Sequence, residues 1–420
     1  MAAWYNPPAL GIALLSVQAA QRRITRNLSP VGTEKVPLAH GLGRVLSTHI
    51  RSIDLPVFDN SSVDGFAVIA SDVRSASSAA PCRLKVVADI PAGTYSRVRL
   101  KPGQAARIMT GAPVPRNATA VLMLEDTDSV SRQADSKPPK WISAYRSLRA
   151  GANIRQRGTD VKRGRRVLFA GQGLRSQDLG MLAMLGTSEV RVFRRPRVAL
   201  LSSGNELVGP DRALRPGAIR DTNSTTLAAL IEQMGCDVIR LGVARDTKRA
   251  IEILLERAIE QRADLIISSA GVSVGALDLV REVIREHGRL HFWRVNVRPG
   301  KPLAVGEYRG VMFIGLPGNP VSAFVGFELF VRPALARLAG LKAIARRIVR
   351  VTLTESFESD GRESYLRAIV AEKEGSLIAR LTGHQGSGNL LSLVQANALL
   401  VVPAGVKSLA IGDQANAWLL

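Results

Sequence analysis

Residues 197–335 alternate short apolar runs with longer amphipathic segments. The runs RVALLSSG, CDVIRLGVA and ADLIISSAG have the length of buried strands, and each is followed by apolar residues at helical spacing. VMFIGLPGNPVSAFVGFELFVRPAL continues the pattern as a strand that enters a helix. Repeated strand–helix units predict a doubly wound parallel sheet, whose ligands bind at the carboxyl ends of the strands.

The pattern changes on both sides of this region. Helical spacing begins near residue 10, and SQDLGMLAMLG predicts a second helix over 176–186. Short alternating or apolar runs separated by Gly and Pro predict a β-rich module over 83–126, with a surface loop at 131–140. From residue 346 the helical period is lost, and four runs ending in NALLVVPAG predict a small antiparallel barrel or sheet.

The composition is that of a globular protein with more than one core. The 420 residues are 46% hydrophobic and 22% charged, which suits roughly two to four domains. The two cysteines, Cys82 and Cys236, exclude a disulfide framework or zinc-ribbon spacing and indicate a reducing compartment. No apolar run reaches the roughly 20 residues that span a bilayer, and the N-terminal stretch lacks the preceding positive charge of a signal peptide. We therefore expect a cytoplasmic protein without a membrane partner.

The charge balance is strongly basic. Lys and Arg number 57 against 35 acids, a net charge of +22, which favours polyanions such as nucleic acid, an anionic surface or a phosphorylated small molecule. The basic clusters are spread along the chain, which is typical of a solvated basic surface. Aromatic residues make up 5% of the chain, so we do not expect a base-stacking nucleic-acid platform.

Three predicted strands end in unusual loops. LSSGNEL, SSAGVSVGALD and GLPGNPVSA follow strands of the parallel sheet and therefore face the same edge. Small residues let backbone amides approach a phosphate, and the following helix N-terminus adds a positive end. A single loop of this kind is more typical of an ordinary turn, because Gly and Ser are common turn residues. Together the loops predict a phosphate-binding crevice that includes Ser203, Gly271, Ser273, Gly275, Gly318 and Asn319.

A basic segment lies between the second and third loops. FWRVNVRPGKP offers Arg294, Arg298 and Lys301 to a single anion, and arginine forks bind oxyanions through paired hydrogen bonds. A basic surface strand would have the same composition. Both interpretations stay open on the residues alone.

Carboxylates follow three of the strands. Acids beside phosphate loops suggest a hard divalent ion such as Mg²⁺, and Glu206, Asp246 and Asp278 are the candidates. Away from a ligand the same acids would be helix N-caps. Motifs for a serine nucleophile, a zinc protease, a Walker A loop or a dinucleotide fingerprint are absent, and the five histidines have no ligand spacing. The residues alone therefore give no sign of a side-chain nucleophile.

Longer motifs occur in a specific order. They are DNSSVDGFAV at 59–68, IMTGAPVP at 108–115, NIRQRGTDVKRG at 153–164, SSGNEL at 202–207, GAIRDTN at 217–223, SSAGVSVGALD at 268–278, RPGKP at 298–302, LPGNPVSA at 316–323 and TGHQGSG at 382–388. From about residue 10 to its end, the chain resembles the molybdopterin molybdenumtransferases, a family that includes the E domain of gephyrin.

The resemblance implies an activity and its residues. The activity is the Mg²⁺-dependent transfer of molybdate to adenylylated molybdopterin, with release of AMP, in molybdenum cofactor biosynthesis. The implied catalytic residues are Asp59 and Asp160 together with the predicted metal ligands Glu206, Asp246 and Asp278. The resemblance also places a set of residues around the two substrates, namely Thr110, Arg155, Arg294, Arg298, Pro317, Pro320, Arg367 and Ser387.

The resemblance implies a four-domain subunit that forms a homodimer. We expect a helical and extended linking domain that mediates dimerisation, a β-rich second domain that reaches into the partner's crevice, an α/β domain with the molybdopterin-binding fold, and a small C-terminal β-barrel. Their expected limits are 1–55 with 148–193, 56–147, 194–340 and 341–420. Further expected partners are the molybdopterin adenylyltransferase and molybdoenzyme chaperones.

The chain departs from the usual motifs at a few positions. Ala270 stands where a glycine is usual, Thr159 replaces an acid, and Arg294 and Arg298 stand where lysines are frequent, which changes hydrogen-bond geometry. The alternative function is a non-catalytic scaffold, or a paralogue of the same fold that binds a pterin or a protein. Retention of all five implied acids argues against a scaffold. Nucleic-acid binding would rest on charge alone.

Overall fold

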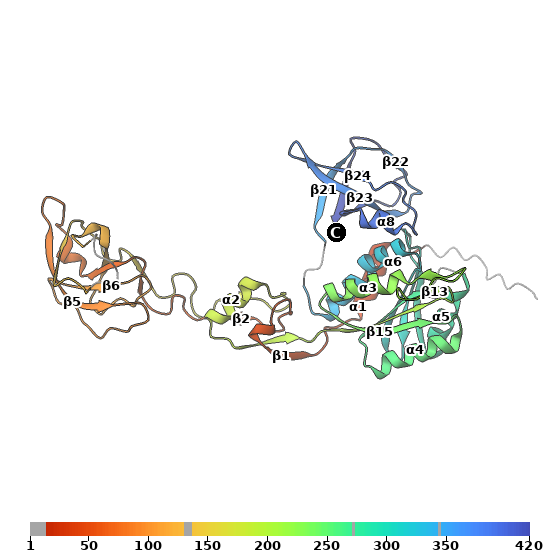
Figure 1. Cartoon of the computed structure of the whole chain (residues 1–420), viewed down its shortest axis with the longest axis horizontal. Helices are drawn as coiled ribbons and strands as arrows, with labels where there is room; N and C mark the ends of the chain where they lie inside the picture. Colours follow the sequence, from red (N-terminus) through yellow and green to blue (C-terminus); the bar gives the residue numbers. More distant parts are fainter. Residues whose placement is uncertain (1–13, 130–136, 271–273, 343–345) are drawn as a thin grey trace, which may run out of the picture. The chain divides into compact units, whose positions relative to one another are not determined.

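The computed structural model describes residues 14–129, 137–270, 274–342 and 346–420, with the backbone alone for 270 and 274–278. The chain divides into two compact units, one formed by 1–48 with 170–420 and the other by 49–169. The larger unit contains a sheet covered by helices and a C-terminal barrel, and the smaller unit is rich in strands (Figure 1).

A six-stranded sheet lies at the centre of the larger unit. Its first four strands run parallel, which confirms the parallel sheet that the alternating pattern predicted. Each of the last two strands runs antiparallel to the strand before it in the sheet. The basic RPGKP segment connects these two strands along the chain. The order across the sheet is β15 (Asp237–Ala244), β12 (Arg197–Ser203), β16 (Leu265–Ala270), β20 (Val311–Leu316), β19 (Pro302–Tyr308) and β17 (Gly288–Arg294).

Helices cover both faces of this sheet. Along β12, Val198 and Leu200 belong to one apolar cluster and Ala199 and Leu201 to another, because successive side chains of a strand point to opposite faces. The fold is therefore doubly wound. The first cluster contains residues of α1 (Val17–Arg26), α3 (Thr222–Gln233), α6 (Pro320–Gly326), the π-helical turn η4 (Phe327–Val331) and α7 (Arg332–Leu338), and the second contains residues of α4 (Lys248–Glu260) and α5 (Val274–His287).

A short helix and a ribbon complete this part of the larger unit. The helix α2 (Ser176–Met184) confirms the one predicted over 176–186. β1 (Thr33–Pro37) pairs with β11 (Glu189–Phe193) in antiparallel register. Residues from the two separate stretches of the expected linking domain therefore lie side by side.

The C-terminal residues form the predicted β-barrel. Its strands are joined in a ring, because the first and last strands of the series β23, β24, β21, β27 and β25 also pair with each other. β18 (Val297–Arg298), which belongs to the RPGKP segment, adds to β23 and so brings this basic segment against the barrel. The barrel elements are β21 (Ile348–Leu353), β23 (Glu363–Lys373), β24 (Ser376–Leu381), α8 (Leu390–Val394), β25 (Ala398–Val402) and β27 (Gln414–Leu419), with a ribbon of β22 (Phe357–Glu358) and β26 (Ser408–Leu409).

The smaller unit contains the predicted β-rich module. Its five-stranded sheet has an apolar layer on each face, with Phe66 in one layer and Ala67 in the other. The order is β7 (Ala120–Met123), β4 (Gly65–Val68), β6 (Gln104–Ile108), β5 (Cys82–Ile90) and β8 (Trp141–Ala144). Two ribbons, β3 (Asn60–Ser61) with β9 (Ile154–Arg155) and β2 (Ile50–Arg51) with β10 (Arg166–Leu168), belong to the same unit. Most of the loop predicted at 131–140 lies outside the described residues.

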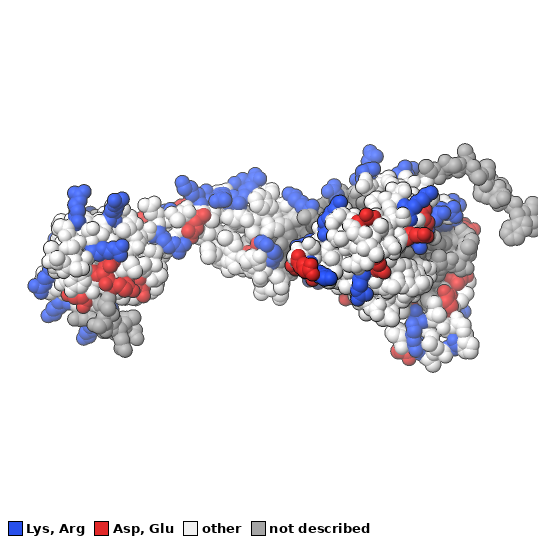
Figure 2. Space-filling view, turned by 90° about the horizontal axis from the view of Figure 1, so that it is seen from above, with Lys and Arg blue, Asp and Glu red and all other residues white. Residues whose placement is uncertain are grey.

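Basic side chains are distributed over the surface of both units. Figure 2 shows Lys and Arg scattered over the visible face, with acidic side chains between them. This distribution agrees with the spread of basic clusters along the sequence. Among the described helices, none is long and apolar enough to cross a membrane.

Candidate functional site

The three loops singled out by the sequence follow neighbouring strands. β12, β16 and β20 lie side by side in the sheet, and β15, which precedes Asp246, is the next strand beyond β12. The parallel register pairs Ser203 with Ala244 on one side and with Ala270 on the other, so these strands end at one level. Their loops are therefore arranged along a single edge of the sheet.

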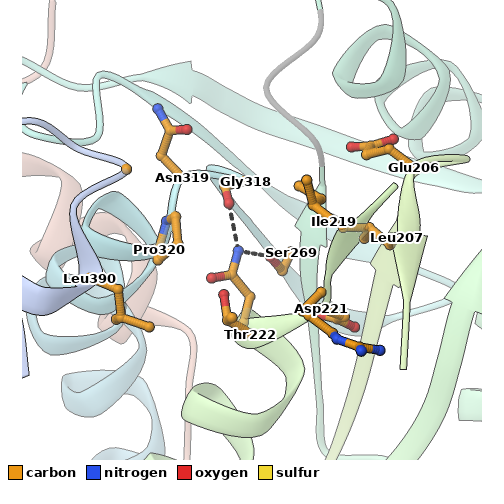
Figure 3. A pocket seen from close by; sticks show the side chains of 13 residues that line it. Glu206, Leu207, Ile219, Asp221, Thr222, Ser269, Gly318, Asn319, Pro320 and Leu390 are labelled. Atoms are coloured by element: carbon orange, nitrogen blue, oxygen red, sulfur yellow. Dashed lines mark hydrogen bonds between the residues drawn. The ribbon is translucent and has the colours of Figure 1, made fainter. Parts of the chain in front are cut away.

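A cavity of about 440 Å³ opens at this edge, and we call it the carboxylate cavity. In Figure 3, Asn319 and Pro320 line one side, and Glu206, Leu207 and Ile219 line the other. The predicted residues that line it are Glu206, Gly318, Asn319 and Pro320, and the lining residues that the sequence did not single out include Asp221, Asn223 and Ser269.

Asn223 connects the ends of two neighbouring strands. This residue is buried in the first turn of α3, and its Nδ2 donates hydrogen bonds to Ser269 Oγ and to the backbone oxygen of Gly318, each over 2.7 Å (Figure 3). The neighbouring Asp221 caps the same helix by accepting from the backbone nitrogen of Ser224 over 3.0 Å. The motif GAIRDTN contains both residues, but an Asp and an Asn at a helix start are typical of capping, which explains why the sequence did not distinguish them.

Two buried polar atoms near the ends of β12 and β15 have no hydrogen-bond partner among the described residues. Asp246 Oδ2 accepts from the backbone nitrogen of Asn205 over 3.3 Å, and Asn205 Oδ1 accepts from the backbone nitrogen of Asp246 over 3.3 Å. Asp246 Oδ1 and Ser203 Oγ are buried and have no hydrogen-bond partner among the described residues. A buried carboxylate oxygen without a partner is costly unless a donor or a cation meets it.

Glu206 directly follows Asn205, which is hydrogen-bonded to Asp246, and it lines the carboxylate cavity. Gly204 adopts φ +154°, and a Cβ added there would lie 2.8 Å from a carboxylate oxygen of Glu206. The glycine therefore lets the Glu206 carboxylate lie against the backbone. Carboxylate oxygens from two adjacent loops are a donor set that fits a hard cation such as Mg²⁺.

A second cavity, of about 350 Å³, lies where the barrel meets the α/β sheet, and we call it the basic cavity. The backbone nitrogen of Val321 in α6 donates to the backbone oxygen of Ser387 over 3.0 Å, so the barrel loop is fixed to the start of the helix. The lining brings together six predicted residues, Arg298, Lys301, Pro317, Asn319, Arg367 and Ser387, with further residues that include Ser322, Arg362 and Gln385.

Arg367 is a buried cation that has no acidic partner among the described residues. Its side chain is 1% exposed, Nε donates to Ser392 Oγ over 3.0 Å, and Nη2 donates to the backbone oxygen of Gly386 over 3.0 Å. Burial, together with the charge of Arg298, lowers the pKa of Arg367 to about 10. Among the described residues no carboxylate forms an ion pair with it. A desolvated guanidinium of this kind is stabilised when an anion occupies the cavity.

One acid faces the other cations of the basic cavity. Asp360 Oδ2 accepts from Arg362 Nε over 3.0 Å, and Arg298 Nη1 lies 3.7 Å from the same oxygen. Among the described residues, Asp360 is the one acid that forms an ion pair with any of Arg298, Lys301, Arg362 and Arg367. Four cations therefore line the cavity, and one carboxylate outside its lining pairs with two of them.

Arg294 occupies a different environment. Its guanidinium carbon lies 3.7 Å from the ring centre of Trp293, and the residue lines neither the carboxylate cavity nor the basic cavity as the described residues form them. Arg294 and Arg298, which the sequence offered to one anion, thus have different surroundings, because β17 ends at Arg294 and Arg298 belongs to β18, which pairs with β23 of the barrel.

Four predicted residues belong to the smaller unit. Asp59 Oδ1 accepts from the backbone nitrogen of Arg157 over 2.7 Å, and Arg155 forms an ion pair with Asp160. β3 and β9 bring these segments together, with Asn60 opposite Arg155.

Thr110 of the same unit is bound to an acid that the sequence did not single out. Its backbone nitrogen and its Oγ1 both donate to Asp64 Oδ1, each over 2.7 Å. These two hydrogen bonds hold the pKa of Asp64 below its ordinary value. Asp64 is the second acid of DNSSVDG, so the motif itself contained the signal.

The remaining predictions concern the loop SSAGVSVGALD. Gly271 and Ser273 lie outside the described residues, and Gly275 and Asp278 fall in α5, in the part described by its backbone alone. Elsewhere among the described residues, Glu252, Glu286 and His287 place possible ligand atoms within 4.8 Å of one another on α4 and α5. Glu286 is already paired with Lys248, and Glu252 Oε1 lies 3.5 Å from His287 Nε2, so each acid already has a partner.

Family models match the chain along its length. Residues 15–186 match the MoeA N-terminal region (domain I and II), 199–337 match a probable molybdopterin binding domain, and 350–420 match the MoeA C-terminal region (domain IV). A molybdopterin molybdenumtransferase 2 of Mycobacterium tuberculosis is 38% identical over 413 residues, which cover 96% of this chain and 99% of that protein. The chain belongs to the molybdopterin molybdenumtransferase family. A molybdopterin molybdenumtransferase of Nostoc is also 38% identical, over 89% of this chain and 85% of its own.

Solved structures of molybdopterin molybdenumtransferase relatives share the fold. The molybdopterin biosynthesis MoeA protein of Pyrococcus horikoshii superimposes with a TM-score of 0.83 at 33% identity, over 97% of this chain and 99% of that chain. The family membership confirms the resemblance drawn from the ordered motifs, and it confirms the combination of a molybdopterin-binding α/β fold with a C-terminal barrel.

Proposed function

We propose that this protein transfers molybdate to adenylylated molybdopterin and releases AMP, forming molybdenum cofactor. The family relatives are named for this transferase activity. The observation that supports it most strongly is the buried Arg367, which has no acidic partner among the described residues and lines a cavity next to three further cations.

The basic cavity would bind the molybdate dianion. Arg298 and Arg367 provide guanidinium forks, Lys301 adds a third charge, and Ser387 adds a hydroxyl. Tetrahedral oxyanions are bound well by such donors, because each guanidinium offers two parallel N–H groups. Asn319 lines both cavities, so an anion in the basic cavity would lie next to a substrate in the carboxylate cavity.

The carboxylate cavity would hold the phosphate end of the adenylylated pterin with its Mg²⁺. By the family resemblance, the metal would be bound by Glu206, which lines this cavity, together with Asp246 and Asp278. The metal would neutralise charge on the phosphoanhydride. The chain's own residues would orient the two substrates. Asn223 holds Gly318 and Ser269 in the wall of the carboxylate cavity, and Asn319 lies at the boundary with the basic cavity. Most of the acceleration would come from positioning and electrostatic stabilisation.

The direct test is AMP release from purified protein with adenylylated molybdopterin, Mg²⁺ and molybdate. We expect release that depends on molybdate, and Arg367→Met should raise the molybdate requirement by about 10- to 150-fold, the loss of one charge-assisted bond. Arg380→Met removes an exposed arginine of the same barrel and is the matched control. A folded wild-type protein that releases no AMP would favour the scaffold function instead.

The proposal includes a homodimer in the cytoplasm. By the family resemblance, Asp59, Thr110, Arg155 and Asp160 of one subunit would complete the crevice of its partner. Mixing Asp59→Asn with Asp246→Asn, at a Mg²⁺ concentration too low for Asp246→Asn alone, should then restore part of the activity, because some dimers contain one intact site. Either variant mixed with wild-type protein controls for subunit exchange. A strict monomer in light scattering would rule out this shared site. The molybdopterin adenylyltransferase would supply the substrate, and molybdoenzyme chaperones would take the product.

A further inference from the structure

Asp360 holds an unusual place beside the basic cavity. Its Oδ1 accepts from the backbone nitrogen of Arg362 over 3.1 Å, and its Oδ2 accepts from Arg362 Nε over 3.0 Å, so the carboxylate is fixed by the residue two positions along the chain. Arg362 Nη1 in turn donates to the backbone oxygen of Val297 over 3.3 Å, which fixes this turn of the barrel to β18. The position of the Asp360 carboxylate is therefore set by the barrel and not by Arg298.

The contact with Arg298 is looser. Arg298 Nη1 lies 3.7 Å from Asp360 Oδ2, which is beyond hydrogen-bond distance but within the range of an ion pair. Among the described residues Arg298 has no other acidic partner, and its guanidinium also lines the basic cavity. Arg298 is therefore shared between a fixed carboxylate and whatever anion enters the cavity.

We propose that Asp360 is a built-in competitor for Arg298 that lowers the affinity of the basic cavity for oxyanions. This inference rests on the proposed function, because it assumes that the cavity binds an oxyanion. In the empty protein the carboxylate partly neutralises Arg298 and reduces the repulsion between Arg298 and the buried Arg367. An entering dianion must draw Arg298 away from Asp360. The acid thereby sets how much oxyanion is needed to fill the site, and it favours anions that satisfy Arg298 and Arg367 together.

The alternative role of Asp360 is to hold Arg298 in place for the anion. The two roles predict opposite effects of removing the charge. A competitor that is removed leaves tighter anion binding, whereas an orienting contact that is removed leaves weaker binding. The distance of 3.7 Å favours competition, since a group that orients a guanidinium makes a directed hydrogen bond.

The test is calorimetric titration of the full-length protein with tungstate and with molybdate, in the absence of pterin. Asp360→Asn keeps the acceptor for the Arg362 amide and removes the charge, and we expect about fivefold tighter binding, the effect of roughly 1 kcal/mol for a partly exposed ion pair. Asp413→Asn makes the same charge change in a barrel residue that accepts from the backbone nitrogen of Ala410, and it should leave the affinity unchanged. In an Arg298→Ala background, Asp360→Asn should give little further gain, because the group that it competes for is gone.

The outcomes separate this inference from the proposed function. If the wild-type protein and Asp360→Asn both bind no oxyanion, the assignment of the basic cavity itself is wrong. If the wild type binds and Asp360→Asn binds equally or more weakly, the cavity assignment stands and the competitor role is wrong. Tighter binding in Asp360→Asn that persists unchanged in the Arg298→Ala background would also contradict it, because the effect would then be a general change in charge.

Discussion

The side-chain amide of Asn319 donates a hydrogen bond to the hydroxyl of Ser387 over 2.8 Å. Asn319 follows β20 of the α/β sheet and Ser387 belongs to the barrel, so this bond joins the two at the boundary between the carboxylate and basic cavities. The two substrates of the proposed reaction would therefore meet at a point that two folding elements define together.

Asn319→Ala should loosen this boundary. We expect the molybdate concentration for half-maximal AMP release to rise by about 2- to 10-fold, the loss of one neutral hydrogen bond. Asn416→Ala removes an exposed amide from β27 of the same barrel and should change nothing. An unaltered molybdate requirement in Asn319→Ala would show that the barrel loop is held by its backbone contacts alone.

Asp246→Asn should weaken the response to Mg²⁺. The buried Oδ1 of Asp246 has no hydrogen-bond partner among the described residues, and an amide is a poor ligand for a hard cation. We expect the Mg²⁺ concentration for half-maximal AMP release to rise at least about tenfold. Asp211→Asn, at an exposed acid that pairs with Arg212, is the control. Equal Mg²⁺ dependence in the two variants would show that Asp246 is not a ligand of the metal.

Thr110→Val should raise the pKa of Asp64 toward its ordinary value. The hydroxyl donation is lost and the backbone donation remains, so part of the cause of the lowered pKa is removed. Because the pKa of Asp64 is lower in the folded protein, its stabilising effect is present above the ordinary aspartate pKa of about 3.9 and is lost as the pH falls. The pKa is measured by NMR of carboxyl-labelled aspartate, with Thr94→Val, an exposed threonine of the same unit, as the control. An unchanged Asp64 pKa would contradict the role of the hydroxyl.

Glu328→Gln should destabilise the larger unit. The Glu328 carboxylate is fully buried in η4 and accepts from Arg332 Nε over 2.7 Å and from Arg346 Nη2 over 2.9 Å, so it joins α7 to the segment that enters the barrel. Removing one member of a buried ion-pair group leaves two cations without their partner, at a cost of about 3 kcal/mol. Urea unfolding measures the change, and Glu260→Gln at the exposed end of α4 is the matched control.

The same carboxylate predicts a pH dependence. Burial raises the pKa of Glu328, but the hydrogen bonds from Arg346 and Arg332 outweigh it, and the pKa stays below its ordinary value. The stabilisation is then fully present above the ordinary glutamate pKa of about 4.3 and is lost as the pH falls through the lower folded-state pKa. The difference in unfolding free energy between wild type and Glu328→Gln should shrink on acidification. A constant difference between pH 7 and the acid range would mean that Glu328 is not ionised in the folded protein.

The sequence by itself determined the alternating strands and helices of the parallel part of the sheet, but it did not predict the antiparallel strands β17 and β19. Each strand or helix of the α/β sheet has a period of 2 or 3.6 residues, or an unbroken apolar run, because each must bury one face or both. The carboxyl-end rule then placed the loops after β12, β16 and β20 at one edge, and the structure has these strands as neighbours. The ordered motifs identified the family, and six of the predicted residues line the basic cavity.

Only the tertiary structure decided which side chains meet. Asn223 binds Ser269 and Gly318, which lie 46 and 95 positions away, and no local pattern encodes such contacts. Arg294 and Arg298 are equivalent in the sequence, yet one stacks on Trp293 and the other lines the basic cavity, because β17 ends at Arg294 and Arg298 belongs to β18, which pairs with the barrel. In the sequence, Arg367 does not differ from other arginines in predicted strands. In the folded barrel it is buried and, among the described residues, has no carboxylate as an ion-pair partner. The period of hydrophobic residues shows which side chains of a segment face the core and which face water. The partners of a buried charge depend instead on how segments distant in the sequence pack together.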